Sequence, residues 1–129
     1  MIVVDTSALV GSLAGHSESP SSLRLRSLIA EGERLMIPTL VLYEWLRGPR
    51  QALELALQEA LFPVQNNIQL GRAEAELSAT IYKSIRRPRG REIDIAIAAC
   101  AVLRGAPIWT LNPSDFADIP GLRLLPARP

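Results

Sequence analysis

Short apolar runs alternate along the chain with longer segments of helical pattern, and this alternation restricts the fold more than any other feature. The first run, Ile2–Val4, is rich in β-branched residues and apolar on both faces, as is typical of a buried parallel strand. Further strands are expected at 35–37, 62–64, 107–110 and 122–125. Strands that alternate with helices form a parallel sheet covered on both faces. The chain is therefore predicted to be an α/β protein, a three-layer α/β/α sandwich around a mostly parallel sheet of four to five strands.

The helical segments carry recognisable start and stop residues. Ser19 and Pro20 provide an N-cap and a first helical residue, and Gly32 provides a stop. Helices are also expected at 39–48, 49–61, 70–85 and 92–104, and the one at 70–85 is indicated by apolar residues that recur at helical spacing. The sequence contains no repeat, linker or low-complexity tract, so residues 1–129 are predicted to form a single domain.

Composition excludes several classes of protein and site. The single cysteine, Cys100, rules out an internal disulfide and a cysteine-based zinc cluster. The single histidine, His16, lies in a Gly/Ser-rich stretch and is expected at the surface, which argues against zinc chemistry and a histidine general base. No apolar run approaches the roughly 20 residues that a membrane span requires. Asp5 stands where a signal peptide needs its apolar core, so a cytoplasmic protein is expected.

Asp5 comes directly after the first predicted strand, at its C-terminal end. In open α/β sheets, ligands bind at this edge. Thr6 and Ser7 follow, and they can begin a helix and hold the carboxylate. The alternative is that Asp5 serves only as the cap of that helix.

Two further acids lie in predicted helices. Glu44 is surrounded in sequence by apolar residues, and a partly buried carboxylate must be paired, protonated or metal-bound. A surface pair with Arg47 is the alternative. Asp94 precedes nine apolar residues and so heads a helix expected to be buried nearly all round. A favourable interaction with the helix dipole is the alternative, although Glu92 already supplies it at a more exposed position.

Asp115 follows the predicted strand at 107–110 in a turn-forming segment, so it is either a ligand or a turn residue. Asp118 is expected to be a surface turn residue.

The four acids are expected to meet at one place. Strands that end at one sheet edge place Asp5 and Asp115 together, and Glu44 and Asp94 stand early enough in their helices to reach that edge. Four carboxylates cannot share a pocket as bare anions, and oxygen ligands select Mg²⁺ or Mn²⁺. We therefore expect one divalent-metal site, with Asp5 and Asp94 as the most direct ligands.

Five basic residues and no acid lie between Lys83 and Arg91. Thirteen of the chain's fourteen cations are arginine, whose planar guanidinium suits phosphate. A solvated face is the alternative, but the run ends three residues before Asp94 and can border the predicted site. Contacts to an RNA backbone are therefore predicted, and these would be salt-sensitive and independent of base sequence. The predicted RNA-binding residues are Arg86, Arg87, Arg89 and Arg91.

Four segments, IVVDTSAL, LVLYEWLRG, GREIDIAIAACAV and WTLNPSDF, resemble in order the acidic motifs of the PIN domain, and most closely those of VapC-like toxin ribonucleases. The resemblance spans the whole chain. It implies a PIN-like nuclease domain with an acidic metal site, in which Thr6, Ser7 and Asn112 occupy supporting polar positions. It also implies an endoribonuclease toxin that forms a homodimer and is inhibited by a cognate antitoxin whose C-terminal segment covers the active site. Trp45 and Pro113 are less typical of these motifs.

Two other functions remain open from the sequence. One is a catalytically inactive PIN-like module that binds RNA or a protein. The other is a phosphotransfer domain, either receiver or phosphatase-like, which also places Asp at strand ends. The phosphatase requires a second acid where this chain has Ser7, and the receiver requires a lysine near its phosphorylated Asp, whereas Lys83 lies in the basic run.

Overall fold

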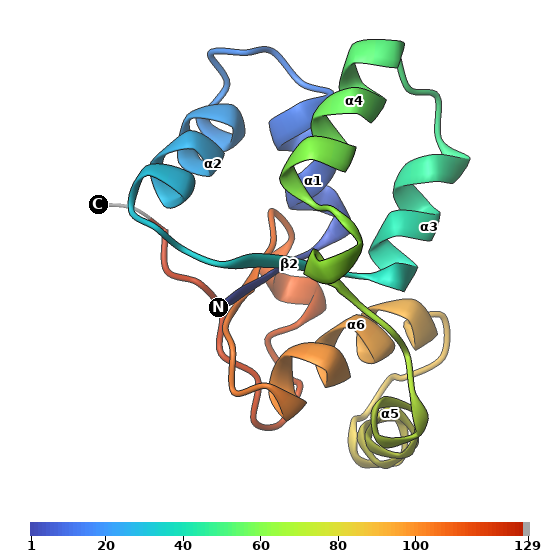
Figure 1. The fold of residues 1–129 in the computed structure, drawn as a ribbon. Coiled ribbons are helices and arrows are strands. Elements are labelled where there is room, and N and C mark those ends of the chain that lie inside the picture. The colour runs from blue at the N-terminus through green and yellow to red at the C-terminus, as the bar shows by residue number, and fades with distance from the viewer. Residues whose placement is uncertain (128–129) are drawn as a thin grey trace.

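A computed structural model describes residues 1–127 and shows helices on both faces of one sheet (Figure 1). The predicted domain of residues 1–129 thus extends two residues beyond the described part. The sheet is parallel, has strand order β3-β2-β1-β4, and consists of β1 (Ile2–Val4), β2 (Leu35–Pro38), β3 (Asn67–Ile68) and β4 (Ile108–Trp109). The upper layer in Figure 1 contains α1 (Thr6–Leu13), α2 (Pro20–Ala30), α3 (Thr39–Arg47) and α4 (Ala52–Leu61). The lower layer contains α5 (Arg72–Ser84) and α6 (Glu92–Leu103). The predicted fold class is confirmed.

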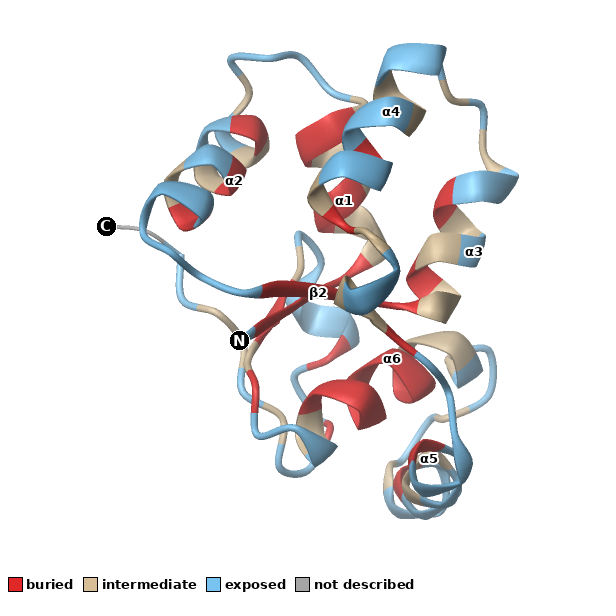
Figure 2. Ribbon diagram, viewed as in Figure 1, coloured by how far each residue is buried: buried red, intermediate tan, exposed pale blue. Residues whose placement is uncertain are grey.

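The core lies between β1 and the helices that cover it. All residues of β1 and β2 are buried, and in α6 the seven consecutive residues 95–101 are buried as well (Figure 2). A helix that is apolar all round belongs inside a protein. The run that follows Asp94 in the sequence therefore fixes α6 between the sheet and α5.

Two strand predictions are wrong in detail. The segment 62–64 is not a strand, because the Phe62 N–H bonds to Gln58 at the end of α4 and a 3₁₀ turn (Val64–Asn66) follows. The edge strand is β3 instead. The segment 122–125 forms only an isolated bridge, between Leu124 and Ile108. Pro126 has no N–H with which to continue a ladder beyond it.

Two helices begin later than predicted, because a glutamate side chain fixes each start. Glu54 accepts a hydrogen bond from the Gln51 N–H at 2.8 Å, so α4 begins at Ala52. Glu74 accepts one from the Gly71 N–H at 3.0 Å, so α5 begins at Arg72. Both are capping contacts between a residue before the helix and a glutamate in its first turn. Within residues 1–127, no helix is long and apolar enough to cross a membrane.

Candidate acidic site at the sheet edge

Asp5 is held at the C-terminal end of β1 by both its backbone and its side chain. Its N–H donates to Trp109 O at 2.9 Å, which continues the pairing of β1 with β4. The buried carboxylate accepts hydrogen bonds at Oδ2 from Ser7 Oγ and Thr110 Oγ1, each at 2.8 Å. Asp5 occupies the N-cap position of α1, but its side chain makes no capping hydrogen bond. Its carboxylate is therefore oriented by hydroxyl groups at the sheet edge.

Thr110 is a functional candidate that the sequence prediction did not include. Its hydroxyl donates to Asp5, lies 3.2 Å from Ser7 Oγ, and accepts the Asn112 N–H at 3.0 Å. The Leu111 N–H donates to Ser7 Oγ at 2.9 Å and closes the network. The available signal was position: Thr110 is a polar residue at the C-terminal end of a predicted strand, on the same edge as Asp5.

Glu44 is held on both carboxylate oxygens. Thr6 Oγ1 donates to Oε1 at 2.6 Å, and Arg47 Nη2 lies 3.3 Å from Oε2. The Glu44 side chain is 18% exposed. Glu44 is partly buried, as expected, although its apolar neighbours Tyr43 and Leu46 are both more than half exposed. Glu44 thus lies at the border between the buried and exposed faces of α3, with the predicted Arg47 pair and a second partner.

Asp94, in the first turn of α6, is the acid whose pKa is affected by the other three. Burial raises its pKa to about 6, and neighbouring carboxylates add to this rise, whereas Arg91 opposes it. Those carboxylates, in order of effect, belong to Asp5, Asp115 and Glu44. Glu92 accepts the Gly90 N–H at 2.9 Å, so the exposed acid makes the local contact at this helix start. The other three predicted acids, from three separate segments of the chain, therefore lie near enough to Asp94 to raise its pKa.

Asp115 is exposed in a short 3₁₀ turn (Pro113–Asp115) after β4. Its N–H donates to Asn112 O at 3.0 Å, and its carbonyl accepts from Arg91 Nη2 at 2.9 Å. Asp118, expected to be only a surface turn residue, is exposed but pairs with the same guanidinium at 2.6 and 2.9 Å. The pairing spans 27 residues, and no local pattern in the sequence indicates it.

The donors at this edge fit a hard divalent cation. They are carboxylate oxygens, and a bound cation would favour the ionised form of Asp94, whose pKa is raised first by burial and then by the neighbouring carboxylates. In the described part of the chain, no three acidic, His or Cys side chains converge tightly enough to surround a metal as they stand. Mg²⁺ usually keeps several waters and binds through one or two carboxylates, which an open arrangement can provide. His16 is exposed, as predicted, and its Nδ1 accepts the Glu18 N–H.

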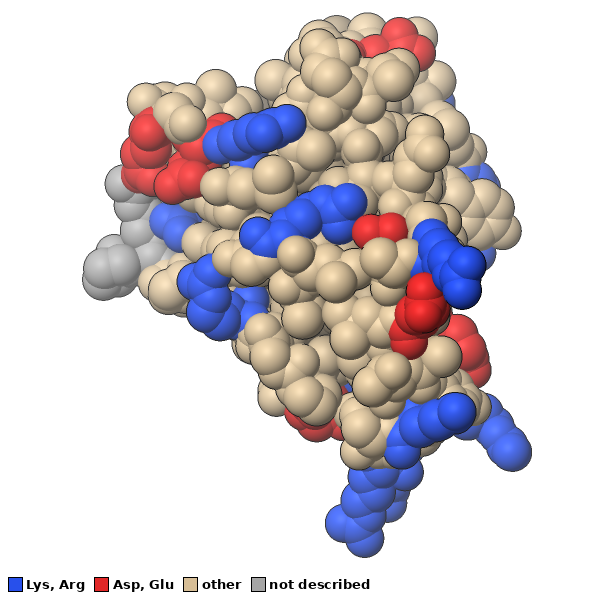
Figure 3. Space-filling model, turned by 60° about the horizontal axis from the view of Figure 1, so that its bottom comes forward, with Lys and Arg blue, Asp and Glu red and all other residues tan. Residues whose placement is uncertain are grey.

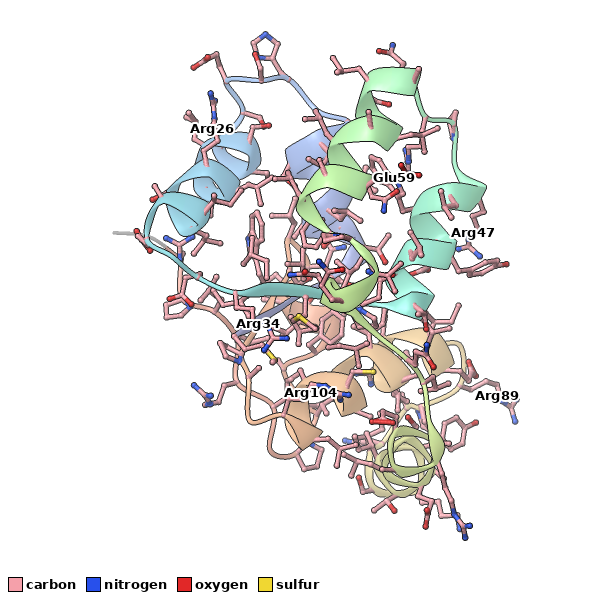
Figure 4. The ribbon with its side chains drawn as sticks, in the orientation of Figure 1. Arg26, Arg34, Arg47, Glu59, Arg89 and Arg104 are labelled. Atoms are coloured by element: carbon pink, nitrogen blue, oxygen red, sulfur yellow. The ribbon has the colours of Figure 1, made fainter. Side chains whose placement is uncertain are left out.

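The basic run divides into two kinds of residue. Arg86, Arg87 and Arg89 are exposed between α5 and α6, and Arg89 extends away from the body of the molecule on the same side as Arg47 in Figure 4. Arg91 is 21% exposed and already paired. Figure 3 shows basic side chains spread over the face in view, several beside acidic ones, rather than gathered in one patch. Contact of this run with RNA stays a prediction.

Comparison with known proteins shows likeness over nearly the whole chain. The family model described as PIN domain matches residues 2–122. Ribonuclease VapC19 of Mycobacterium tuberculosis is 31% identical over 125 residues, which cover 95% of this chain and 98% of that protein.

Solved structures agree with this likeness. A toxin–antitoxin complex from Klebsiella pneumoniae contains a chain with a TM-score of 0.69 and 25% identity, covering 95% of each chain. VapBC2 from Rickettsia felis, bound to a DNA fragment from its promoter, gives a TM-score of 0.72 at 18% identity, covering 99% of this chain and 100% of the other. DNA-bound VapBC from Salmonella typhimurium gives a TM-score of 0.71 at 22% identity, and the match covers 96% of each chain. At these lower identities the likeness shows the fold.

Proposed function

Because the chain belongs to the PIN-domain family, we propose that it is a Mg²⁺- or Mn²⁺-dependent endoribonuclease that hydrolyses RNA phosphodiester bonds. The observation that carries this proposal is the acidic site at one edge of the sheet, where hydroxyl groups orient Asp5 and Glu44 and where three other carboxylates add to the raised pKa of Asp94. The name of the relative from Mycobacterium tuberculosis, a ribonuclease, supports the choice of RNA as substrate. We propose that the whole chain acts as one nuclease domain.

Asp5 and Asp94 are the proposed principal metal ligands, and Glu44 and Asp115 complete the site. When bound, the divalent cation supplies positive charge against the phosphate and lowers the pKa of water to give a nucleophile near neutral pH. Ser7 and Thr110 both donate to Oδ2 of Asp5, so these bonds orient the carboxylate while leaving Oδ1 to other partners.

The surroundings of the site contribute differently to substrate binding. A cavity of ≈ 580 Å³ is lined in part by Thr110, Leu111 and Arg24 but by none of the four acids, so it is not the proposed cleavage site. The exposed side chains of Arg86, Arg87 and Arg89 would hold the RNA backbone by phosphate contacts. Such contacts contribute affinity without base preference.

We further propose that the protein is the toxin of a toxin–antitoxin pair, works in the cytoplasm, forms a homodimer, and is neutralised by a cognate antitoxin. Support comes from the likeness to a chain of the Klebsiella pneumoniae complex. The surface also suits a protein partner, because Ile29, Leu53 and Leu57 are exposed and line a groove of ≈ 480 Å³ between α2 and α4. Expression of the chain alone should arrest bacterial growth, whereas expression of Asp94→Asn should not.

The activity is tested by hydrolysis of single-stranded and structured RNA with Mn²⁺, comparing wild type with Asp5→Asn and Asp94→Asn. Arg72→Gln is a matched control, because its partner Glu76 and its own side chain are largely exposed on α5. We expect cleavage by wild type and the control, and loss of cleavage in both Asn variants. Equal cleavage by all four proteins would place the activity elsewhere.

The open arrangement of the carboxylates favours one alternative, a PIN-like module that binds RNA or protein without cutting. Titration with Mn²⁺ separates the two functions. The nuclease requires metal binding that Asp5→Asn and Asp94→Asn weaken, whereas absence of binding to wild type supports the inactive module.

A further inference from the structure

The Arg91 guanidinium is enclosed by acceptors. Nη1 donates to Asp118 Oδ2 at 2.9 Å and to Arg87 O at 3.3 Å. Nη2 donates to Asp118 Oδ1 at 2.6 Å and to Asp115 O at 2.9 Å. A guanidinium has five N–H groups, and these contacts engage four of them. A forked contact from Arg91 to a phosphate would therefore require breaking bonds within the protein.

The backbone of Arg91 is fixed as firmly as its side chain. Its carbonyl accepts the Ile95 N–H at 2.9 Å, which begins α6, and its own N–H donates to Pro88 O at 3.0 Å. Gly90, with φ of +84°, makes the turn between these two contacts. Arg91 is thus anchored just before the helical turn that carries Asp94.

The segment that Arg91 holds is anchored to the core by the buried Phe116, whereas Asp115 itself has few attachments. Asp115 lies exposed at the end of a single 3₁₀ turn, and its N–H bonds back within that turn. A planar guanidinium that holds a carboxylate at two points and a carbonyl at a third fixes orientation as well as distance. Lysine presents a point charge and cannot reproduce this fork.

We propose that Arg91 is a positioning residue, which with Asp118 clamps the Asp115 turn against the start of α6 and so sets Asp115 relative to Asp94. The proposal rests on the nuclease function proposed above. It separates Arg91 from the three exposed arginines of the run and assigns a role to Asp118, which the acidic motifs do not include.

The test compares Arg91→Gln, Arg91→Lys, Asp118→Asn and the Arg91→Gln/Asp118→Asn double variant. Residues that orient a metal site typically contribute 10–100-fold to metal affinity or activity. We expect Arg91→Gln to lower kcat about 10-fold or more and to weaken Mn²⁺ binding, measured by calorimetry, by a similar factor. KM for RNA and the salt dependence of binding should stay within about twofold, because no phosphate contact is lost. Asp118→Asn should act in the same direction, and the double variant should be no worse than Arg91→Gln.

Arg91→Lys should resemble Arg91→Gln, because the fork is lost although the charge remains. The controls are Arg72→Gln and Glu76→Gln, which break an exposed Arg–Glu pair on α5 and should change neither Mn²⁺ affinity nor kcat. All proteins are compared well below their unfolding temperatures, so that a loss of stability alone does not change the measured kcat or Mn²⁺ affinity.

Three results would overturn the clamp. The first is a higher KM with a smaller salt dependence in Arg91→Gln while Asp118→Asn is normal, which identifies an RNA contact. The second is a lower unfolding temperature with unchanged Mn²⁺ affinity and kcat. The third is wild-type behaviour of Arg91→Gln and Asp118→Asn while Asp5→Asn is inactive. This result contradicts the clamp and leaves the nuclease proposal intact. Cleavage by Asp5→Asn and Asp94→Asn would instead contradict the nuclease proposal, and the Mn²⁺ titration would still test the clamp.

Discussion

Thr6 Oγ1 donates a 2.6 Å hydrogen bond to Glu44 Oε1, which joins the first turn of α1 to the middle of α3 across 38 residues of sequence. Thr6 follows directly after Asp5, so one short segment supplies an acid and orients another. The position of Glu44 at the site therefore depends on the packing of α1 against α3 as well as on its own helix.

Replacing Thr6 with Val should remove this bond while keeping the β-branched shape. We expect the rate of RNA cleavage to fall about 10-fold and the free energy of unfolding to fall by about 1 kcal/mol. Thr6→Ser keeps a hydroxyl and should retain most of both. Cleavage kinetics and urea unfolding measure the two effects, and equal behaviour of the Val and Ser variants would contradict the role of this bond.

Asp94→Asn should make the metal-free protein more stable at neutral pH. The folded pKa of about 6 exceeds the ordinary value of 3.8, so between these values the folded protein binds more protons than the unfolded chain. The free energy of unfolding of wild type therefore falls as pH rises through this window. At pH 7 in EDTA we expect the variant to be more stable by about 1–2 kcal/mol, which is less than the full shift because solvent screens this partly buried group. Near pH 3.5 the difference should vanish. Urea unfolding at the two pH values measures this, and a variant less stable at pH 7 contradicts it.

Glu74 should show the opposite dependence on pH. Its pKa is lowered, chiefly by its own backbone N–H and against the effect of burial, with further help from the Gly71 N–H and Arg104. The ionised Glu74 therefore stabilises the protein at pH values above the pKa that it has in the unfolded chain. This stabilisation is lost as the pH falls through the lower pKa that it has in the folded protein. Glu74→Gln should lower the free energy of unfolding by about 1 kcal/mol at pH 7 and by much less at pH 3. Glu76→Gln, in the same helix but exposed, should change stability little at either pH.

Neutralising Arg86, Arg87 and Arg89 together should weaken RNA binding and reduce its dependence on salt. Each phosphate contact to a single strand contributes about 0.7 to the slope of log K against log salt, so the triple Gln variant should lose about 2 from that slope. Binding of single-stranded RNA by the non-cleaving Asp94→Asn protein at several salt concentrations measures the change. An unchanged slope would place the RNA on another face.

Much of the fold was predictable because each element carries its own pattern. The β-branched run at Ile2–Val4 and the apolar stretch after Asp94 allow little besides a buried strand and a buried helix. Parallel topology then brings strand ends to one edge, and on this basis Asp5 and Asp115 were expected near each other. Burial of Asp5 and the coupling of Asp94 to the other acids agree with that placement, while their catalytic roles stay predictions.

Contacts between distant side chains were not predictable in the same way. Thr110 meets Asp5 across 105 residues, and Arg91 meets Asp118 only because separate turns bring two exposed loops together. Neither contact can be recognised from a periodic pattern of residues in the sequence. The edge strand Asn67–Ile68 was missed for a related reason, since two residues are too few to form an alternating pattern.

The four acids differ in how much of the molecule must open before each one moves. Asp5, Glu44 and Asp94 belong to elements packed around β1, so their displacement requires disruption of the core. Asp115 lies on an exposed turn that is held by the bonds to Arg91, by those within the turn and by the buried Phe116 that follows it. Amide hydrogen exchange should accordingly be faster at Asp115 than at Asp5. A local opening of this turn would remove Asp115 from the site while the other three acids remain in place, so the number of acids around the metal depends on the least buried segment that carries one.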